Sequence, residues 1–226
     1  MIDNRRNLLI LFYTMIVVML GFGMVIPIMP FYIETFGAGG IALGMLMATY
    51  GIMQFLFAPV WGSLSDYYGR KPILLLGVIG NALAMILMGL SSELWMLFAA
   101  RALAGLLSSA TLPTAMAYIG DSTSEENRGG GMGMMGAAMG IGMVLGPGLG
   151  GWLAGSSLSI PFILAGALSV LAFVLILLIL PESLLQKSAT RKITGPQISV
   201  LWQALAGPLG ILFILSFLLS FGLTNF

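Results

Sequence analysis

Residues 4–34 read NRRNLLILFYTMIVVMLGFGMVIPIMPFYIE, a pair of arginines followed by an apolar run with no charged residue before Glu34. A helix that crosses a bilayer needs about 20 mostly apolar residues, and the stretch Leu8–Tyr32 is long enough. A secretory signal would have a shorter apolar core and a small-residue cleavage site. The stretch therefore predicts a first transmembrane helix that stays in the protein.

Similar apolar segments follow along the whole chain, which is 59% hydrophobic and only 8% charged. A soluble domain carries about 25% charged residues, so the composition predicts an all-α membrane protein. The very short connections on one side predict that sequence neighbours pair as antiparallel hairpins. The expected spans are Leu8–Tyr32, Ile41–Trp61, Pro72–Leu90, Leu94–Tyr118, Gly130–Ala154, Ile160–Leu180 and Gly207–Phe226.

The basic residues fall in alternate connections between these spans. Lys and Arg collect on the cytoplasmic side of membrane proteins, so the pattern predicts a multi-pass protein of the cell membrane with a cytoplasmic N-terminus. Of the nine basic residues, only Arg101 falls within a span. The others are Arg5 and Arg6, Arg70 and Lys71, Arg128, and the group Lys187, Arg191 and Lys192.

The polar segment 182–206 separates six spans from a seventh. We interpret 1–181 as a six-helix half, 182–206 as a cytoplasmic linker, and 207–226 as a truncated seventh helix that begins a second half. No polar flank follows the seventh span before the chain stops at Phe226. We therefore expect that the six-helix half is completed by a missing C-terminal half or by a second copy.

Several classes of function are excluded by composition. The chain has no His and no Cys, which leaves almost no set of residues for catalysis or for binding a metal. The net charge of +1 offers no basic field for nucleic acid. We expect no enzyme, no metal, no cofactor and no nucleic-acid partner.

The segment between the second and third spans, Gly62 to Pro72, is predicted to be a loop at the membrane face. It contains Gly62, Asp66, Gly69, Arg70 and Lys71. A carboxylate there can accept from a cation or from the free N–H groups of a helix N-terminus. Such a contact could form in one conformation and break in another, although a solvated loop is an equal alternative.

Arg101 is a charge within the fourth span, where burial costs a few kcal/mol unless the residue has a partner, a cavity or room to reach the interface. It is a candidate to bind an anionic or polar substrate group, or to tune a nearby carboxylate. Gln54 and Asn81 are lone amides in the second and third spans, and they either bond between helices or line a polar cavity. The segment Asp121 to Arg128 is interpreted as a solvated cytoplasmic turn, with pairing to the other cytoplasmic charges as the alternative.

Glycines recur every four residues in the fifth span, at Gly142, Gly146 and Gly150. This spacing places them in one stripe on which a second helix can pack closely. Pro147 removes a backbone donor and favours a kink. The stripe predicts close packing, and it could also serve as a pivot on which two helices rock.

Three of these segments, in this order, resemble the motifs of the major facilitator superfamily. The segment Gly62-x-Leu64-Ser65-Asp66-x-x-Gly69-Arg70-Lys71 is similar to the family's loop motif. Leu97-x3-Arg101-x2-Ala104-Gly105 and Gly142-x3-Gly146-Pro147-x2-Gly150-Gly151 resemble two motifs of its drug:proton antiporter branch. Pro27-x-x-Pro30, Asp121 to Arg128 and Leu180-Pro181-Glu182-Ser183 also fit, and the stretch from Tyr50 to Met96 is most similar to the tetracycline exporters.

The resemblance implies two six-helix halves around a central cavity and alternating access by rocking of the halves. It assigns Asp66 and Arg70 to a cytoplasmic gate, Arg101 to proton coupling and Gly146-Pro147 to the pivot. The tetracycline exporters carry acidic residues at the places of Val18 and Ala84, so the resemblance does not extend to recognition of a metal–tetracycline chelate. We expect the carboxylate that couples transport to protons to lie in the missing half.

These features lead to one main hypothesis and two alternatives. The main hypothesis is a secondary transporter that uses the proton gradient to export lipophilic, drug-like molecules. One alternative is a facilitator of a narrow solute such as a sugar or metabolite, for which a more polar cavity is expected. The other is a membrane receptor that does not transport.

Overall fold

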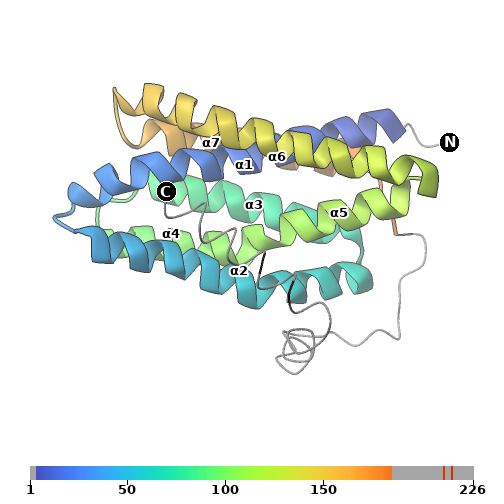
Figure 1. Cartoon of the computed structure of the whole chain (residues 1–226), viewed down its shortest axis with the longest axis horizontal. Coiled ribbons are helices and arrows are strands. Elements are labelled where there is room, and N and C mark those ends of the chain that lie inside the picture. Colours follow the sequence, from blue (N-terminus) through green and yellow to red (C-terminus); the bar gives the residue numbers. More distant parts are fainter. Residues whose placement is uncertain (1–3, 185–210, 212–214, 216–226) are drawn as a thin grey trace.

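The computed structural model describes residues 4–184, 211 and 215. Within this part of the chain, six helical spans are long and apolar enough to cross a membrane, and no strand occurs. Figure 1 shows the helices lying lengthwise beside one another. The predicted all-α membrane fold is therefore confirmed. Apart from the few described residues, the predicted linker and seventh span lie outside this part of the chain.

The helices have well-defined bounds, and one span consists of three consecutive elements. α4, the 3₁₀ helix η1 and α5 follow one another without a gap and together form the fourth span. The elements are α1 (Asn4–Glu34), α2 (Gly40–Tyr68), α3 (Arg70–Gly89), α4 (Leu94–Leu107), η1 (Ser108–Ala110), α5 (Thr111–Ser122), α6 (Glu125–Ala154) and α7 (Ile160–Ile179).

Most of the close helix pairs are distant in sequence. α1 packs along α6, α2 along α4 and α3 along α7. Among sequence neighbours, only α3 and α4 pack extensively, so the predicted pairing of neighbours as hairpins is wrong in most cases. A short connection makes two helices antiparallel, but which helices touch depends on where each has small residues or a matching surface.

The junction between α2 and α3 differs from the predicted loop between Gly62 and Pro72. α2 continues to Tyr68 and α3 begins at Arg70, so only Gly69 lies outside the helices. Gly69 has a φ of 117°, which favours glycine because a side chain is strained there. The apolar pattern ends at the membrane face, whereas the helix continues beyond it, and hydropathy alone therefore placed the helix end too early.

The fourth span, predicted as one helix, is interrupted by η1. Pro113 has no N–H and cannot donate to the carbonyl four residues before it. That carbonyl belongs to Ser109, within η1. In addition, the carbonyl of Leu106, just before η1, accepts a hydrogen bond from Trp61 Nε1 of α2 at 2.6 Å. Together these features accommodate a short tight turn within an otherwise α-helical span.

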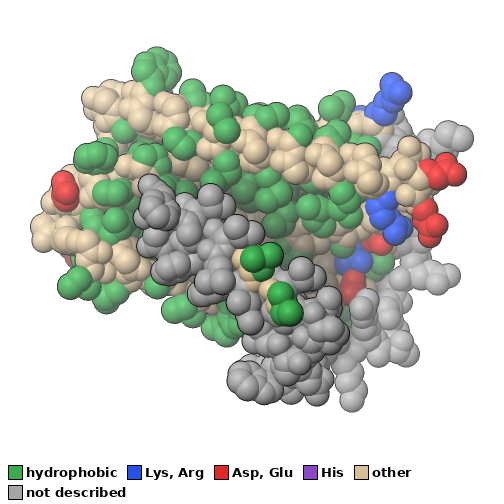
Figure 2. All heavy atoms as spheres, viewed as in Figure 1, with side chains coloured by type: hydrophobic (Ala, Val, Ile, Leu, Met, Phe, Trp, Pro, Cys, Tyr) green, Lys and Arg blue, Asp and Glu red, His purple; other side chains and the backbone are tan. Residues whose placement is uncertain are grey.

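The charged residues gather at the two ends of the bundle. Figure 2 shows Lys and Arg on the visible face at the end where α1 begins, with acidic residues beside them. We call this the basic end; it holds the α2–α3 and α5–α6 junctions. The opposite end carries Glu34 and Glu93. The long sides between the ends expose apolar side chains such as Val144 and Leu178, as expected for contact with lipid.

Candidate functional site

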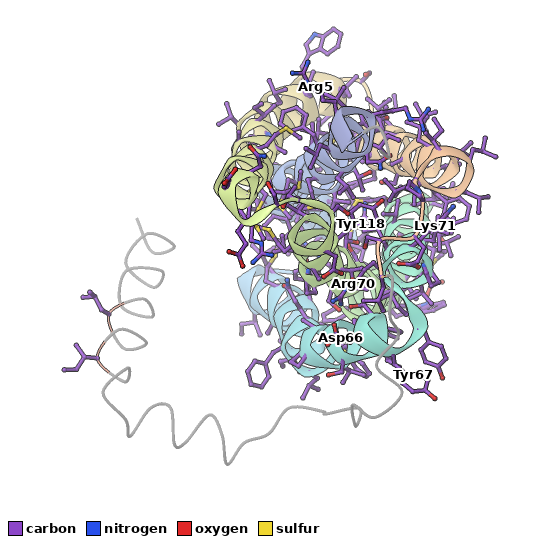
Figure 3. The ribbon with its side chains drawn as sticks, turned by 90° about the vertical axis from the view of Figure 1, so that its right-hand side faces the viewer. Arg5, Asp66, Tyr67, Arg70, Lys71 and Tyr118 are labelled. Atoms are coloured by element: carbon purple, nitrogen blue, oxygen red, sulfur yellow. The ribbon has the colours of Figure 1, made fainter. Side chains whose placement is uncertain are left out.

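Arg70 is the centre of a cluster at the basic end. The residue is only 8% exposed. Its Nη1 forms an ion pair with Asp66 Oδ1 at 2.5 Å and donates to Ser65 Oγ at 2.7 Å, and its Nε donates to Asp121 Oδ2 at 2.8 Å. Figure 3 looks onto this end and shows Arg70 between Asp66 and Tyr118. One guanidinium thus connects the end of α2, the start of α3 and the end of α5.

Glu182, just after α7, closes the cluster from the other side. Its Oε1 accepts from the backbone N–H of Arg70 at 2.8 Å, and its Oε2 accepts from that of Lys71 at 3.2 Å. A carboxylate is favourable at a helix N-terminus, where free N–H groups and the helix dipole meet. A Cβ added to Gly69 would collide with Oε2 of Glu182. Glycine at this junction therefore provides both the backbone conformation and the space for the carboxylate.

Two further contacts attach the segment after α7 to the bundle. The hydroxyl of Tyr118 on α5 donates to the carbonyl of Pro181 at 2.9 Å. The Nζ of Lys71 donates to the carbonyl of Leu177, near the end of α7, at 2.9 Å. We define the Arg70 network as the side chains of Ser65, Asp66, Arg70, Asp121 and Glu182. The network and these two contacts connect four of the six spans at the basic end.

The structure brings the predicted gate residues to one region, although only some of them belong to the network. Asp66, Gly69 and Arg70 lie at the network, and Lys71 lies next to it. Gly62 borders the network, because its carbonyl accepts from Ser65 Oγ at 2.8 Å, and it also lines a cavity.

Asp121 lies at an exposed position, as a solvated turn predicts, and its carboxylate also pairs with Arg70, which was the alternative. This pairing depends on how α3 and α5 pack, so it could not be derived from sequence spacing.

The cavity lies between α1, α2 and the η1–α5 part of the fourth span, and its volume is about 460 Å³. Apolar side chains form most of its wall, and the amide of Gln54 is one of its few polar groups. The cavity is lined by Val18, Met19, Tyr50, Gln54, Ala58, Pro59, Gly62, Ser108, Ser109, Thr111, Leu112 and Pro113.

Asn81 has a different place from Gln54. It is 3% exposed, and its Nδ2 donates to Ser169 Oγ on α7 at 2.9 Å. Its Oδ1 accepts from Ser108 Oγ at 3.2 Å. Asn81 therefore bonds between helices, the first of the two alternatives, and supports the cavity wall at Ser108 from behind.

Arg101 is enclosed in the bundle, with 1% of its surface exposed. Its Nη2 donates to Met47 Sδ at 3.3 Å, and its guanidinium carbon lies 5.4 Å from the ring centroid of Tyr50. The buried Nε has no hydrogen-bond partner. Among the described residues, no carboxylate forms an ion pair with Arg101. The side chain therefore does not reach the membrane interface, and only a sulfur and an aromatic face contact its charge.

The glycine stripe of α6 packs against α1 at backbone distance. A Cβ added to Gly142 would lie 2.7 Å from the carbonyl oxygen of Ile16, and one added to Gly146 would lie 2.8 Å from the Cα of Gly23. At Gly150 the nearest atom, in Ile28, would be 3.1 Å away. The predicted close packing is confirmed, and α1 is the helix that uses the stripe.

A cavity inside a multi-pass bundle and an ion-pair network at its end are features of a membrane transport protein. The model of one protein family, the Major Facilitator Superfamily, matches residues 11–226. The chain belongs to this superfamily, whose members are transporters.

Its curated relatives include proteins named for drug resistance. It is 41% identical to the tetracycline resistance protein, class E, of Escherichia coli over 73% of this chain and 41% of that protein. It is 29% identical to the quinolone resistance protein NorA of Staphylococcus aureus over 98% of this chain and 57% of that protein. Multidrug resistance protein 2 of Bacillus subtilis is 32% identical over 80% of this chain and 46% of that protein. The chain thus spans about half the length of these relatives.

A solved structure has the same fold. The human organic anion transporter MFSD10 (TETRAN) superimposes with a TM-score of 0.73 at 24% identity, over 86% of this chain and 51% of that one. This similarity concerns the architecture of the helices. The described residues contain no group of three His, Cys, Asp or Glu side chains that could hold a metal ion.

Proposed function

We propose that the protein is a proton-coupled exporter of lipophilic, drug-like molecules that works by alternating access. The observation that carries the proposal is the apolar cavity of about 460 Å³, whose wall has few polar groups and no charged residue. Such a wall suits apolar molecules of varied shape better than a sugar, which needs many hydrogen-bond partners. The resistance proteins among the relatives support the same substrate class.

In this proposal, Gln54 provides the polar contact to substrate within the cavity. Val18 lies in the cavity wall, and Ala84 is fully buried elsewhere. Because both are apolar, neither provides a carboxylate for a metal ion chelated by substrate. We therefore expect substrates that bind without a metal.

The Arg70 network acts as the gate at the basic end, and the α1–α6 contact acts as the pivot. Arg70 bonds to two other helices and Glu182 bonds to the first turn of α3, so separating the helices here breaks several charged contacts at once. At the pivot, backbones touch without interlocking side chains, which allows one helix to rock on the other.

Arg101 contributes to proton coupling by stabilising a carboxylate that loses its proton during the cycle. The acidic residues described in the structure all lie at the ends of the bundle, so the coupling carboxylate belongs to a part of the protein outside these six helices. That part is a C-terminal half. A second copy of the chain could enclose the cavity, but it would bring the same acidic residues at the same places. The lipid bilayer, protons and a small-molecule substrate complete the set of partners, and the N-terminus faces the cytoplasm.

The test is uptake of ethidium into inside-out membrane vesicles that contain the protein expressed from its natural gene. We expect uptake driven by a proton gradient, with loss when an ionophore collapses that gradient. Gln54→Leu should lower the apparent affinity for ethidium several-fold, whereas Phe55→Leu, on the exposed side of the same helix, should not. Uptake that ignores the ionophore would contradict proton coupling, and binding without uptake would favour a receptor.

A further inference from the structure

Tyr50 lies between Arg101 and the cavity. Its ring forms part of the cavity wall, and its centroid is 5.4 Å from the guanidinium of Arg101. A cation within about 6 Å of an aromatic centroid is attracted by the ring, and the attraction increases when water is excluded. Tyr50 is therefore the described residue that contacts both the proposed substrate space and the buried charge.

The backbone fixes Tyr50 in this place. Gly105 follows Arg101 by one turn on α4, and a Cβ added to it would lie 2.6 Å from the carbonyl oxygen of Tyr50 and 2.7 Å from the Cβ of Met53. The absence of a side chain at Gly105 thus lets α2 and α4 touch at Tyr50. This contact sets the height of the ring relative to Arg101.

Another aromatic residue restrains the Tyr50 ring from α1. The centroid of Phe22 lies 5.5 Å away, with the ring planes tilted by 43°, within the usual range for aromatic pairs. Three elements therefore hold Tyr50: α1 through Phe22, α4 through Gly105, and α2, to which it belongs.

Arg101 depends on this ring because its other contacts are weak. The sulfur of Met47 is a poor acceptor, and Nε has no partner at all. A buried charge with so few contacts is costly, and the aromatic face provides part of the missing stabilisation.

We propose that Tyr50 is a positioning residue for Arg101, holding the guanidinium by its aromatic face and keeping it apart from the cavity. This inference rests on the proposed transport function. A molecule in the cavity touches one side of the ring while Arg101 touches the other, so the ring couples occupation of the cavity to the position of the charge. Its role depends on the electrons of the ring and not on the hydroxyl.

The first experiment separates coupled export from substrate exchange in the same vesicles. Exchange of ethidium without a proton gradient needs the cavity and the rocking motion but not proton coupling. We expect Tyr50→Phe to keep the ratio of proton-driven export to exchange within twofold of its value in the unmodified protein. Tyr50→Leu should reduce proton-driven export roughly tenfold while exchange falls far less. Equal loss of both activities, or no loss of either, would overturn the proposal.

The second experiment varies only the electrons of the ring. Phenylalanine with one, two or three fluorine atoms is placed at position 50, because each fluorine weakens the attraction for a cation with little change of shape. The melting temperature of the purified protein should fall stepwise with fluorine number. The melting temperature should not fall in this way when Arg101 is replaced by Met, nor when the same series is placed at exposed Phe55. If the melting temperature does not change with fluorine number at position 50, the proposed interaction between Tyr50 and Arg101 is refuted.

The two experiments also distinguish this inference from the proposed function. If the unmodified protein shows no proton-driven export, the proposed function fails, and the role of Tyr50 in coupling fails with it. The melting temperatures of the fluorinated variants do not depend on transport. They therefore test the contact between Tyr50 and Arg101 whether or not the protein exports ethidium.

Discussion

Single residues at the basic end have unusually many partners. Arg70 uses Nη1 for Asp66 and Ser65 and Nε for Asp121, while its backbone N–H donates to Glu182. Lysine could not replace it, because an ammonium lacks the planar group of N–H donors with which arginine bonds to separate acceptors in fixed directions. The geometry of the guanidinium, and not only its charge, connects the helices here.

Arg70→Lys tests this dependence on geometry. We expect proton-driven export to fall about tenfold at unchanged protein amount, because a single ammonium cannot satisfy carboxylates on α2 and α5 together. Lys71→Arg is the matched control, and export should stay within twofold. The side chain of Lys71 donates through Nζ to the carbonyl of Leu177, and the substitution leaves its backbone bond to Glu182 in place. Both rates come from vesicle uptake corrected for protein content. Equal rates for Arg70→Lys and the unmodified protein would refute the assigned geometry.

Gly69→Ala tests the need for glycine at the α2–α3 junction. Gly69 and Gly37 both have positive φ, at 117° and 69°, so alanine should cost about 1–3 kcal/mol at each through backbone strain, and more at Gly69, whose ψ of 158° places it in a region almost confined to glycine. At Gly69 the new Cβ also meets Glu182, whereas at Gly37 nothing lies within 4 Å. Thermal unfolding should therefore show a larger loss for Gly69→Ala than for Gly37→Ala. Equal losses would contradict both the extra strain and the collision at Gly69.

At the scale of elements, the bundle consists of helix pairs joined by different kinds of contact. α1 and α6 meet along the glycine stripe, whereas α3 and α7 are joined by buried side chains, including the bond of Asn81 to Ser169. In the proposed mechanism the first pair is the pivot, whereas the second pair is held together by buried polar groups and moves as a unit.

Gly146→Val and Gly148→Val compare the contact face of α6 with its open face. A side chain at Gly146 would lie 2.8 Å from backbone atoms of α1, while at Gly148 nothing lies within 4 Å. We expect Gly146→Val to abolish ethidium export and exchange together, because the helices can no longer approach. Gly148→Val should retain most of both. If the two variants transport equally well, the stripe is not the pivot.

At the scale of the whole molecule, the six helices are arranged so that charge lies at the ends and apolar surface along the sides. The existence and number of the described spans could be predicted from the sequence, because a stretch of about 20 apolar residues is typical of a helix that crosses a membrane. The helix ends at Tyr68 and Glu125 could not be predicted, because helices continue past the apolar region into polar segments.

The candidate site was predicted only as far as local patterns reach. A contact between Asp66 and Arg70, four residues apart, could be anticipated because a carboxylate in this segment can accept from a nearby cation. Glu182 was noticed in Leu180–Ser183 only as part of a resemblance. Its contact with the first turn of α3 depends on packing across the bundle. Tyr50 carried no signal in the sequence, because an aromatic residue in an apolar span is ordinary until its neighbour is known to be Arg101.

The orientation of the whole molecule can be measured directly. The 226 residues contain no cysteine, so a single introduced thiol is a specific label site. Ser124→Cys lies at the basic end and Ser157→Cys at the opposite end, and both positions are exposed. With the N-terminus in the cytoplasm, a membrane-impermeant maleimide should label Ser157→Cys in intact cells and Ser124→Cys only after permeabilisation. The reverse pattern would invert the proposed topology.

The 3₁₀ helix η1 also changes the rotation and the height of α5, which follows it in the fourth span. A 3₁₀ helix turns by about 120° and rises about 2.0 Å per residue, against about 100° and 1.5 Å for an α-helix. Over the three residues of η1, α5 is therefore rotated by about 60° and displaced by about 1.5 Å relative to an unbroken helix. Asp121, further along α5, carries this offset where its carboxylate binds Arg70. The rotation of the helix at the cavity therefore contributes to the direction of a carboxylate at the membrane surface.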